Sequence, residues 1–111
     1  MNSLSCSRVD VKNLVKSKPQ VAFYFKQRGC VACAMFDKVV KAISPKLKNL
    51  VIAEVLVGVG DGKCETLANR FKVVGTPTII YLLHGRTRRM WIPTGDFTTD
   101  CDTLVEIAND T

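Results

Sequence analysis

Two cysteines, Cys30 and Cys33, are separated by two residues where an apolar stretch, residues 21–25, gives way to a segment with helical spacing. A thiolate in the first turn of a helix faces free backbone N–H groups and the positive end of the helix dipole, which lower the pKa of the thiol. Such a thiolate attacks disulfides, so the pair is a candidate redox centre. Because Cys33 begins an apolar stripe that continues through Phe36, we expect Cys30 to be the exposed, attacking thiol and Cys33 the shielded one.

A zinc site is the alternative interpretation of two cysteines at this spacing. Structural zinc needs four ligands. Cys64 and Cys101 stand singly in apolar stripes of expected helices, and the only histidine, His84, lies at an expected hairpin tip. We therefore expect neither a metal nor an organic cofactor, and we expect Cys64 and Cys101 to pack in the core as small apolar side chains. Cys6 is expected to be exposed, which leaves one functional pair among five cysteines and favours a reducing compartment.

Alternating helical and strand patterns surround the cysteine pair. Helices are predicted at residues 7–17, 30–44, 64–71 and 99–109, and strands at 21–26, 50–57, 78–83 and 87–92. This order predicts an α/β fold, in which a parallel crossover unit is followed by an antiparallel hairpin, so that helices cover both faces of a mixed sheet. The chain has no internal repeat or linker, and residues 1–111 are expected to form one domain.

A second motif, Gly75-Thr76-Pro77-Thr78, immediately precedes one of the predicted strands. A proline that opens a strand is trans in most proteins. The combination of this motif with the cysteine pair, the hairpin and a last helix nevertheless resembles the thioredoxin superfamily across nearly the whole chain. The resemblance implies a thioredoxin-like fold with a mixed four- to five-stranded sheet. It also implies that Pro77 is cis beside the cysteine pair, that the backbone of Thr76 pairs with an extended substrate, and that Gly95 borders the substrate groove.

The residues around the cysteines depart from ordinary thioredoxins. Gly29 stands where thioredoxins usually have tryptophan, which is closer to glutaredoxins, and Val31-Ala32 match the intervening residues of neither class. No histidine lies between the cysteines to stabilise a thiolate, so a strong oxidant is not expected. By the resemblance, the substrate-binding residues are Gly29, Val31, Ala32, Gly75, Thr76, Pro77 and Gly95.

The resemblance also places two polar residues beneath the cysteine pair. Tyr24 stands where thioredoxins carry a buried acid, and Glu54 stands where they carry the lysine that pairs with it. We predict that Tyr24 and Glu54 form a hydrogen-bonded pair that accepts the proton of Cys33. The alternative leaves Glu54 solvated at the rim of its strand, and alternation does not decide between them because buried parallel strands do not alternate cleanly. Asp37 is expected on the other side of its helix, four residues before Lys41.

The resemblance implies a thiol–disulfide oxidoreductase that reduces protein disulfides and is itself restored by a reductase or by glutathione. One alternative is a glutathione-linked, glutaredoxin-like enzyme, which Gly29 favours. Another is a non-catalytic interaction module that keeps the fold and holds a partner in the groove near Cys30, Thr76 and Gly95.

The charge pattern limits the other classes of partner. The net charge of +6 favours acidic protein partners, whereas Arg86, Arg88 and Arg89 are expected on a solvated hairpin without the aromatic platform that a nucleic-acid site needs. No apolar run approaches the roughly 20 residues of a membrane span, and the first residues show no secretory signal. We expect a cytoplasmic monomer that binds neither nucleic acid nor membrane, with Trp91 packed in the core.

Overall fold

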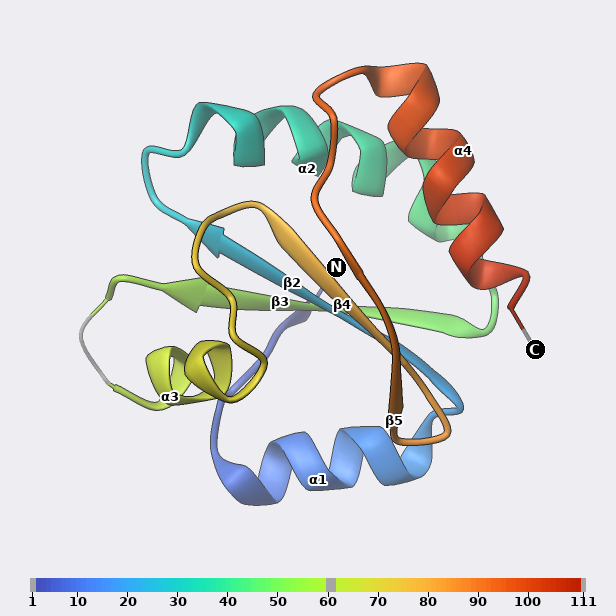
Figure 1. Ribbon diagram of the computed structural model, residues 1–111. Coiled ribbons are helices and arrows are strands. Elements are labelled where there is room, and N and C mark those ends of the chain that lie inside the picture. Colours follow the sequence, from blue (N-terminus) through green and yellow to red (C-terminus); the bar gives the residue numbers. More distant parts are fainter. Residues whose placement is uncertain (1, 60–61, 111) are drawn as a thin grey trace.

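The computed structural model describes residues 2–59 and 62–110. Its elements in chain order are β1 (Asn2–Ser3), α1 (Arg8–Ser17), β2 (Gln20–Gln27), α2 (Val31–Ile43), a 3₁₀ turn η1 (Ser44–Lys46), β3 (Leu50–Val57), α3 (Lys63–Arg70), β4 (Thr78–Leu83), β5 (Arg86–Trp91) and α4 (Phe97–Ala108) (Figure 1).

The strands form one mixed sheet in the order β1-β3-β2-β4-β5. β3 pairs in parallel with β1 and β2, while β4 pairs antiparallel with β2 and β5. The predicted mixed α/β sheet is therefore confirmed. The sequence did not predict β1, which spans two residues and is continued by a hydrogen bond of 2.8 Å from the Leu4 N–H to the Glu54 carbonyl.

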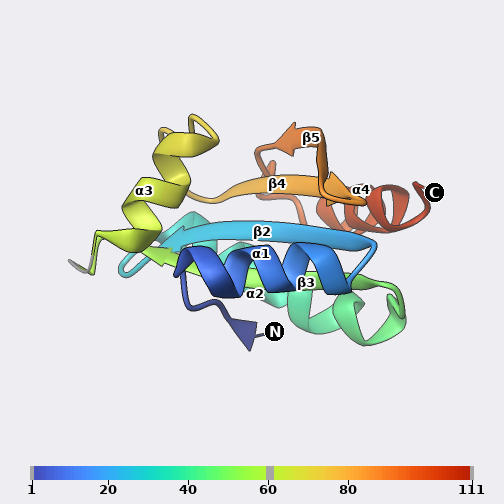
Figure 2. The same cartoon turned by 90° about the horizontal axis from the view of Figure 1, so that it is seen from below.

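Helices cover both faces of the sheet, as predicted. α2 and α4 lie on one face, and α1 and α3 lie on the other (Figures 1 and 2). Under α2 and α4, the ring of Phe36 packs edge-on against both Tyr24 and Trp91, with centroid distances of 4.9 and 5.4 Å. Trp91 is buried, so its expected packing role is confirmed.

Most predicted boundaries agree with the structure because short-range signals determine them. The strands at 50–57 and 78–83 match β3 and β4. α4 instead begins two residues earlier than predicted, at Phe97, because the Asp96 carboxylate caps the helix by accepting from the Thr99 N–H.

The β4–β5 hairpin turns through His84 and Gly85, whose φ angles of +49° and +80° are those of a tight type I′ turn. Beyond the turn, Arg88 pairs with Asp110 and Arg89 pairs with Glu106, each at 3.0 Å. The predicted arginine cluster thus lies on a largely exposed strand that is joined to the C-terminal segment by ion pairs.

The structure overturns two expectations for the cysteines outside the pair. Cys6 is buried rather than exposed, and it forms a disulfide with Cys64, which was expected to be a lone core thiol. The two residues lie 58 positions apart, but each sits at the start of a helix on the same face of the sheet. The protein therefore contains a second disulfide. Cys101 is free and buried, as predicted.

Candidate active site

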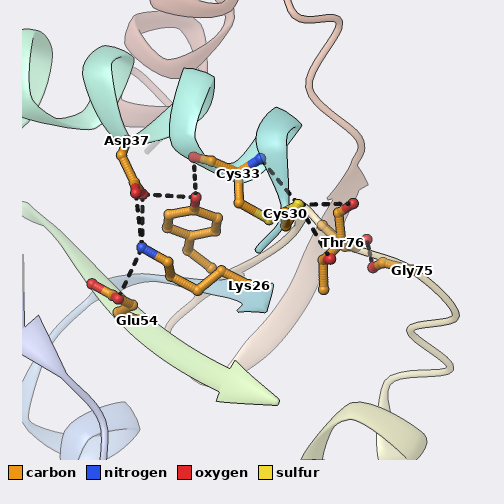
Figure 3. The surroundings of a disulfide bond; sticks show 9 residues. Lys26, Cys30, Cys33, Asp37, Glu54, Gly75 and Thr76 are labelled. Carbon is orange, nitrogen blue, oxygen red and sulfur yellow. Dashed lines mark hydrogen bonds and ion pairs between the residues drawn. A yellow bond between two sulfur atoms is a disulfide. The ribbon is translucent and has the colours of Figure 1, made fainter. Parts of the chain in front are cut away.

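Cys30 and Cys33 form a disulfide at the N-terminus of α2, with their Cα atoms 5.1 Å apart (Figure 3). After β2 ends, Gly29 takes a φ of +74°, a conformation that favours glycine, and turns the chain into the helix. Cys30 is the N-cap residue, and its Sγ accepts a hydrogen bond of 3.1 Å from the Cys33 N–H. This sulfur therefore occupies the position where a helix terminus stabilises negative charge.

The two sulfurs differ in accessibility. Cys33 is 1% exposed, whereas Cys30 is half-buried and is followed by Val31 and Ala32, which are both exposed. This difference supports the predicted roles, in which Cys30 meets the substrate and Cys33 attacks only from within the protein.

The Gly75–Thr78 motif meets the cysteine pair across 46 positions of sequence. The Thr76 hydroxyl donates to Cys30 Sγ at 3.5 Å, and the Thr76 carbonyl oxygen lies 3.7 Å from the same sulfur. The Thr76–Pro77 peptide bond is cis, and the Thr78 hydroxyl donates to the Gly75 carbonyl at 2.7 Å. Thr76 is therefore in direct contact with the sulfur that is expected to react.

Tyr24 lies beneath Cys33, but its partner is not the predicted one. Its hydroxyl is 2.9 Å from the Cys33 carbonyl oxygen and 2.8 Å from Asp37 Oδ1, both of which can accept its hydrogen bond. Burial raises the pKa of Tyr24, and the hydrogen bond to Asp37 and the charges of Asp37 and Glu54 raise it further. The phenol is therefore protonated at neutral pH.

Glu54 binds Lys26 rather than Tyr24, so the predicted Tyr24–Glu54 hydrogen bond is wrong. The strand register does place Glu54 beside Tyr24, but Lys26 Nζ lies 3.1 Å from Glu54 and 2.9 Å from Asp37 (Figure 3). Burial disfavours the charged form of Lys26, but its hydrogen bonds to the two carboxylates outweigh this effect and raise the pKa. Glu54 is also neither fully buried nor fully solvated, with a side chain that is 17% exposed.

The sequence interpretation missed Lys26 and Asp37. Asp37 contacts Tyr24 and Lys26 instead of facing away from the sheet. The available signal was spacing: Asp37 follows Cys33 by one helical turn, and Lys26 follows Tyr24 by two strand positions, so each lies on the same face as its predecessor.

An open pocket of about 340 Å³ connects this polar network with the cysteine pair. Its lining residues are Lys26, Gln27, Arg28, Gly29, Cys30, Cys33, Ala34, Asp37, Glu54 and Leu56. Both sulfur-bearing residues and both carboxylates thus border one space that is wide enough for water.

Gly95 is held by a buried carboxylate that the sequence interpretation missed. Asp100, 1% exposed, accepts from the Gly95 N–H at 3.0 Å and from the Thr94 N–H and hydroxyl at 2.9 and 2.8 Å. Gly95 has a φ of +90°, and a Cβ there would lie 3.9 Å from the methyl group of Met35 on α2. Asp100 therefore fixes the loop beside the first turns of the cysteine-bearing helix.

Among residues 2–59 and 62–110, no group of three or more His, Cys, Asp or Glu side chains is placed to hold a metal ion. None of the helices within the same ranges combines the length and the apolar character that a membrane span requires.

Several solved thioredoxins share the architecture of this chain. A mutant thioredoxin from Halobacterium salinarum superposes with a TM-score of 0.78 at 16% identity, covering 98% of this chain and 91% of its own. Mitochondrial thioredoxin 3 from Saccharomyces cerevisiae, in its oxidised form, gives 0.79 at 15% identity, with 96% and 94% covered. The Fasciola hepatica thioredoxin gives 0.78 at 19% identity, with 96% and 98% covered.

These likenesses show that the chain has the thioredoxin fold. No protein-family model matches the chain, and none of the curated proteins matches it in sequence.

Proposed function

We propose that this thioredoxin-fold protein is a thiol–disulfide oxidoreductase that reduces protein disulfides through Cys30 and Cys33. The observation that carries the proposal is the asymmetric pair at the N-terminus of α2, in which an accessible sulfur caps the helix and a buried sulfur lies behind it. In that arrangement Cys30 is the activated nucleophile. Cys33 is a second thiol that can attack only the mixed disulfide formed at Cys30.

The reaction begins when the Cys30 thiolate attacks one sulfur of a substrate disulfide. A bond forms between Cys30 and the substrate, the substrate S–S bond breaks, and the departing thiolate takes a proton from solvent. Cys33 then loses its proton and attacks Cys30 Sγ, which closes the internal disulfide and releases the second substrate thiolate. The protein has passed two electrons to the substrate, and a reductase or glutathione restores the dithiol.

Two contacts favour the thiolate form of Cys30 in this cycle. The Cys33 N–H and the Thr76 hydroxyl both point toward Cys30 Sγ, at 3.1 and 3.5 Å. Hydrogen bonds to a charged form lower the pKa of the group that carries the charge. The backbone of Thr76 also offers hydrogen-bonding groups to an extended substrate.

Asp37 and Glu54 are positioned to receive the proton of Cys33 through the pocket that they share with it. Lys26 contacts both carboxylates and offsets one of their two negative charges, while Tyr24 links Asp37 to the Cys33 backbone. This network takes the place of the Tyr24–Glu54 pair in the proposed mechanism. A water molecule in the pocket would carry the proton from sulfur to carboxylate.

A glutathione-linked reaction is the second candidate, and Gly29 supports it. A Cβ added at Gly29 would meet nothing within 4 Å, so the approach to Cys30 is open on this side to a small thiol as well as to a protein.

Two assays separate these activities. We expect the wild-type protein with dithiothreitol to accelerate insulin reduction, and Cys30→Ser to abolish the effect. Cys33→Ser should accumulate a mixed disulfide between Cys30 and insulin, visible by mass spectrometry, while Cys101→Ser serves as the matched control with full activity.

Reduction of 2-hydroxyethyl disulfide with glutathione is the second assay. Activity in this assay with Cys30 alone, and none toward insulin, would favour the glutaredoxin-like function. Inactivity in both assays, with the pair still able to oxidise and reduce, would favour a non-catalytic interaction module.

A further inference from the structure

A groove of about 550 Å³ lies between α1 and α3. These two helices cover the opposite face of the sheet from α2 (Figure 1). Its lining residues are Arg8, Val9, Val11, Lys12, Val15, Lys16, Phe23, Arg70, Phe71, Leu82 and Gly85. None of them belongs to the pocket at the cysteine pair.

The floor of the groove is apolar. Val11, Phe23 and Leu82 are buried at its base, and Phe71 and Val15 are half-buried along its sides. Val9, at the edge, is 67% exposed. An apolar side chain that entered the groove would therefore exchange water for aliphatic and aromatic contacts, which favours binding.

The rim of the groove is positively charged. Arg8, Lys12 and Lys16 follow one another at four-residue spacing on α1, and Arg70 is the last residue of α3. All four are exposed, and within the part of the chain that the structure describes none of them forms an ion pair with an acid. No Asp or Glu side chain is among the described residues that line the groove.

This charge arrangement is unfavourable in the isolated protein. Like charges at four-residue spacing on a helix repel one another and reduce the stability of the helix. The hairpin arginines Arg88 and Arg89 differ, because each is paired with an acid. An anionic partner would relieve the repulsion along α1 and fill the apolar floor at the same time.

We propose that the groove between α1 and α3 binds an acidic segment of a partner protein, with carboxylates along the Arg8–Lys16 rim and an apolar side chain on the floor. The three α1 cations span about 12 Å, given the rise of roughly 1.5 Å per residue. A fatty acid has one carboxylate and cannot neutralise charges so far apart. A nucleic acid has the charges but no aliphatic group for the floor. The aromatic side chains that line the groove, Phe23 and Phe71, are buried and half-buried, so neither is an exposed platform on which bases could stack.

Docking in this groove leaves the cysteine pair free. The groove shares no lining residue with the pocket at Cys30, so a partner held by its acidic segment can remain bound while disulfide exchange proceeds elsewhere on the surface. The proposal does not depend on catalysis, and Cys30→Ser is expected to bind the segment as the wild type does.

The test uses a capped peptide in which glutamates flank a Leu-Phe pair, and a control peptide in which Ser-Ser replaces Leu-Phe. We expect amide shifts in the ¹H–¹⁵N spectrum of the full chain to concentrate on α1, α3 and the β4–β5 turn. Added salt should weaken binding of the Leu-Phe peptide. At the same salt concentration, the Ser-Ser peptide should bind more weakly than the Leu-Phe peptide.

Charge-reversal variants make the test specific. Lys12→Glu/Lys16→Glu should lower the affinity about tenfold or more, while Lys41→Glu/Lys48→Glu, with the same change in net charge, should have little effect. Circular dichroism checks that both variants fold. Val15→Ser, which keeps every charge, should also weaken binding of the Leu-Phe peptide but not of the Ser-Ser peptide.

Four results would overturn the proposal. These are equal losses in the two charge-reversal variants, amide shifts away from the groove, equal affinity for the two peptides, and tighter rim-dependent binding to an oligonucleotide or to phosphatidylserine vesicles than to the Leu-Phe peptide. The last result would assign the rim to a nucleic acid or a lipid surface instead.

Discussion

Cys30 and Cys33 are three positions apart, yet the fold gives them different environments. Cys30 caps α2 and contacts Thr76, whereas the Cys33 side chain is almost fully enclosed. Reactivity toward an external reagent depends on both thiolate content and access, and Cys30 has the advantage in each. Cys101 has neither, because burial raises the pKa of its thiol and the charges of Asp102 and Asp100 raise it further.

The first prediction concerns selective alkylation. After gentle reduction of the Cys30–Cys33 disulfide, brief treatment with iodoacetamide at mildly acidic pH should label Cys30 first, because its thiolate is stabilised at the helix terminus. Peptide mapping by mass spectrometry gives the order. Cys101 is the internal control and should stay unlabelled until the protein is unfolded; faster labelling of Cys33 than of Cys30 would reverse the proposed roles.

The second prediction concerns Asp37. Asp37→Asn removes a proton acceptor from the pocket beneath Cys33, so release of substrate from the mixed disulfide should slow by about tenfold or more. The initial attack by Cys30 should be nearly unchanged, because the helix terminus determines its environment. Stopped-flow kinetics with a fluorescent disulfide peptide separates the two steps.

The control for Asp37→Asn is Asp102→Asn, an exposed acid-to-amide change on α4. Equal rates in Asp37→Asn and Asp102→Asn would exclude Asp37 and leave Glu54 or water as the proton acceptor. If Glu54→Gln alone slowed the release, the acceptor would be Glu54.

The third prediction concerns alkaline pH. The pKa values of Tyr24 and Lys26 are raised in the folded protein, so the folded state keeps protons that the unfolded chain loses above about pH 10. Their contribution to the free energy of unfolding is complete below that pH. It should fall above it by up to about 1.4 kcal/mol per pH unit for each group.

Urea denaturation at about pH 8 and about pH 11 measures this loss. Tyr24→Phe removes one titrating group and should therefore lose less stability between the two conditions than the wild type. An equal or greater loss in Tyr24→Phe would show that the tyrosine does not contribute.

At the scale of elements, the loop before α4 is shaped by a side chain from within that helix. Asp100 lies in the first turn of α4, and its carboxylate accepts three hydrogen bonds from Thr94 and Gly95. The loop and the helix that follows it are therefore one unit, and the position of Gly95 beside α2 depends on a buried charge.

The fourth prediction is that Asp100→Asn both destabilises the protein and weakens substrate binding. An amide can replace only one of the two oxygens, and its NH₂ would face the donors of Thr94 or Gly95, so we expect a cost of about 1–3 kcal/mol. In the insulin assay KM should rise more than kcat falls, because Gly95 borders the proposed substrate groove. Asp102→Asn is again the control, and a change in kcat alone would assign Asp100 to a different role.

At the scale of the whole molecule, the Cys6–Cys64 disulfide joins the segment before α1 to the first turn of α3. The closed loop contains more than half of the chain, including β2 and β3, the strands that carry Tyr24, Lys26 and Glu54. A cross-link over a long loop stabilises a protein mainly by restricting its unfolded state.

The fifth prediction is that Cys6→Ser/Cys64→Ser lowers the free energy of unfolding by about 4 kcal/mol, the chain-entropy estimate for a separation of 58 residues. Urea denaturation with the Cys30–Cys33 pair kept oxidised gives the value. Insulin reduction at a temperature where the variant is folded should be nearly unchanged. A free energy of unfolding equal to that of the wild type would show that the disulfide does not stabilise the protein by restricting the conformational entropy of the unfolded chain.

The sequence alone was sufficient for features that depend on neighbouring residues. Helical and strand periodicity, the Cys30–Cys33 spacing and the Gly75–Thr78 motif are local patterns, and the predicted order of elements follows from them. With the resemblance carried by the two motifs, they determined the fold and the place of the redox pair.

Only the tertiary structure decided which distant polar and sulfur-bearing side chains meet. Periodicity indicates which face of an element a residue occupies but not its partner across the core. No cross-core partner was therefore predicted for Cys6, Cys64, Lys26 or Asp37. The packing of α1 and α3 on one face brought the cysteines together, and the packing of α2 on the other placed Asp37 over Lys26 and Tyr24. Such contacts depend on the relative placement of whole elements, which local sequence does not specify.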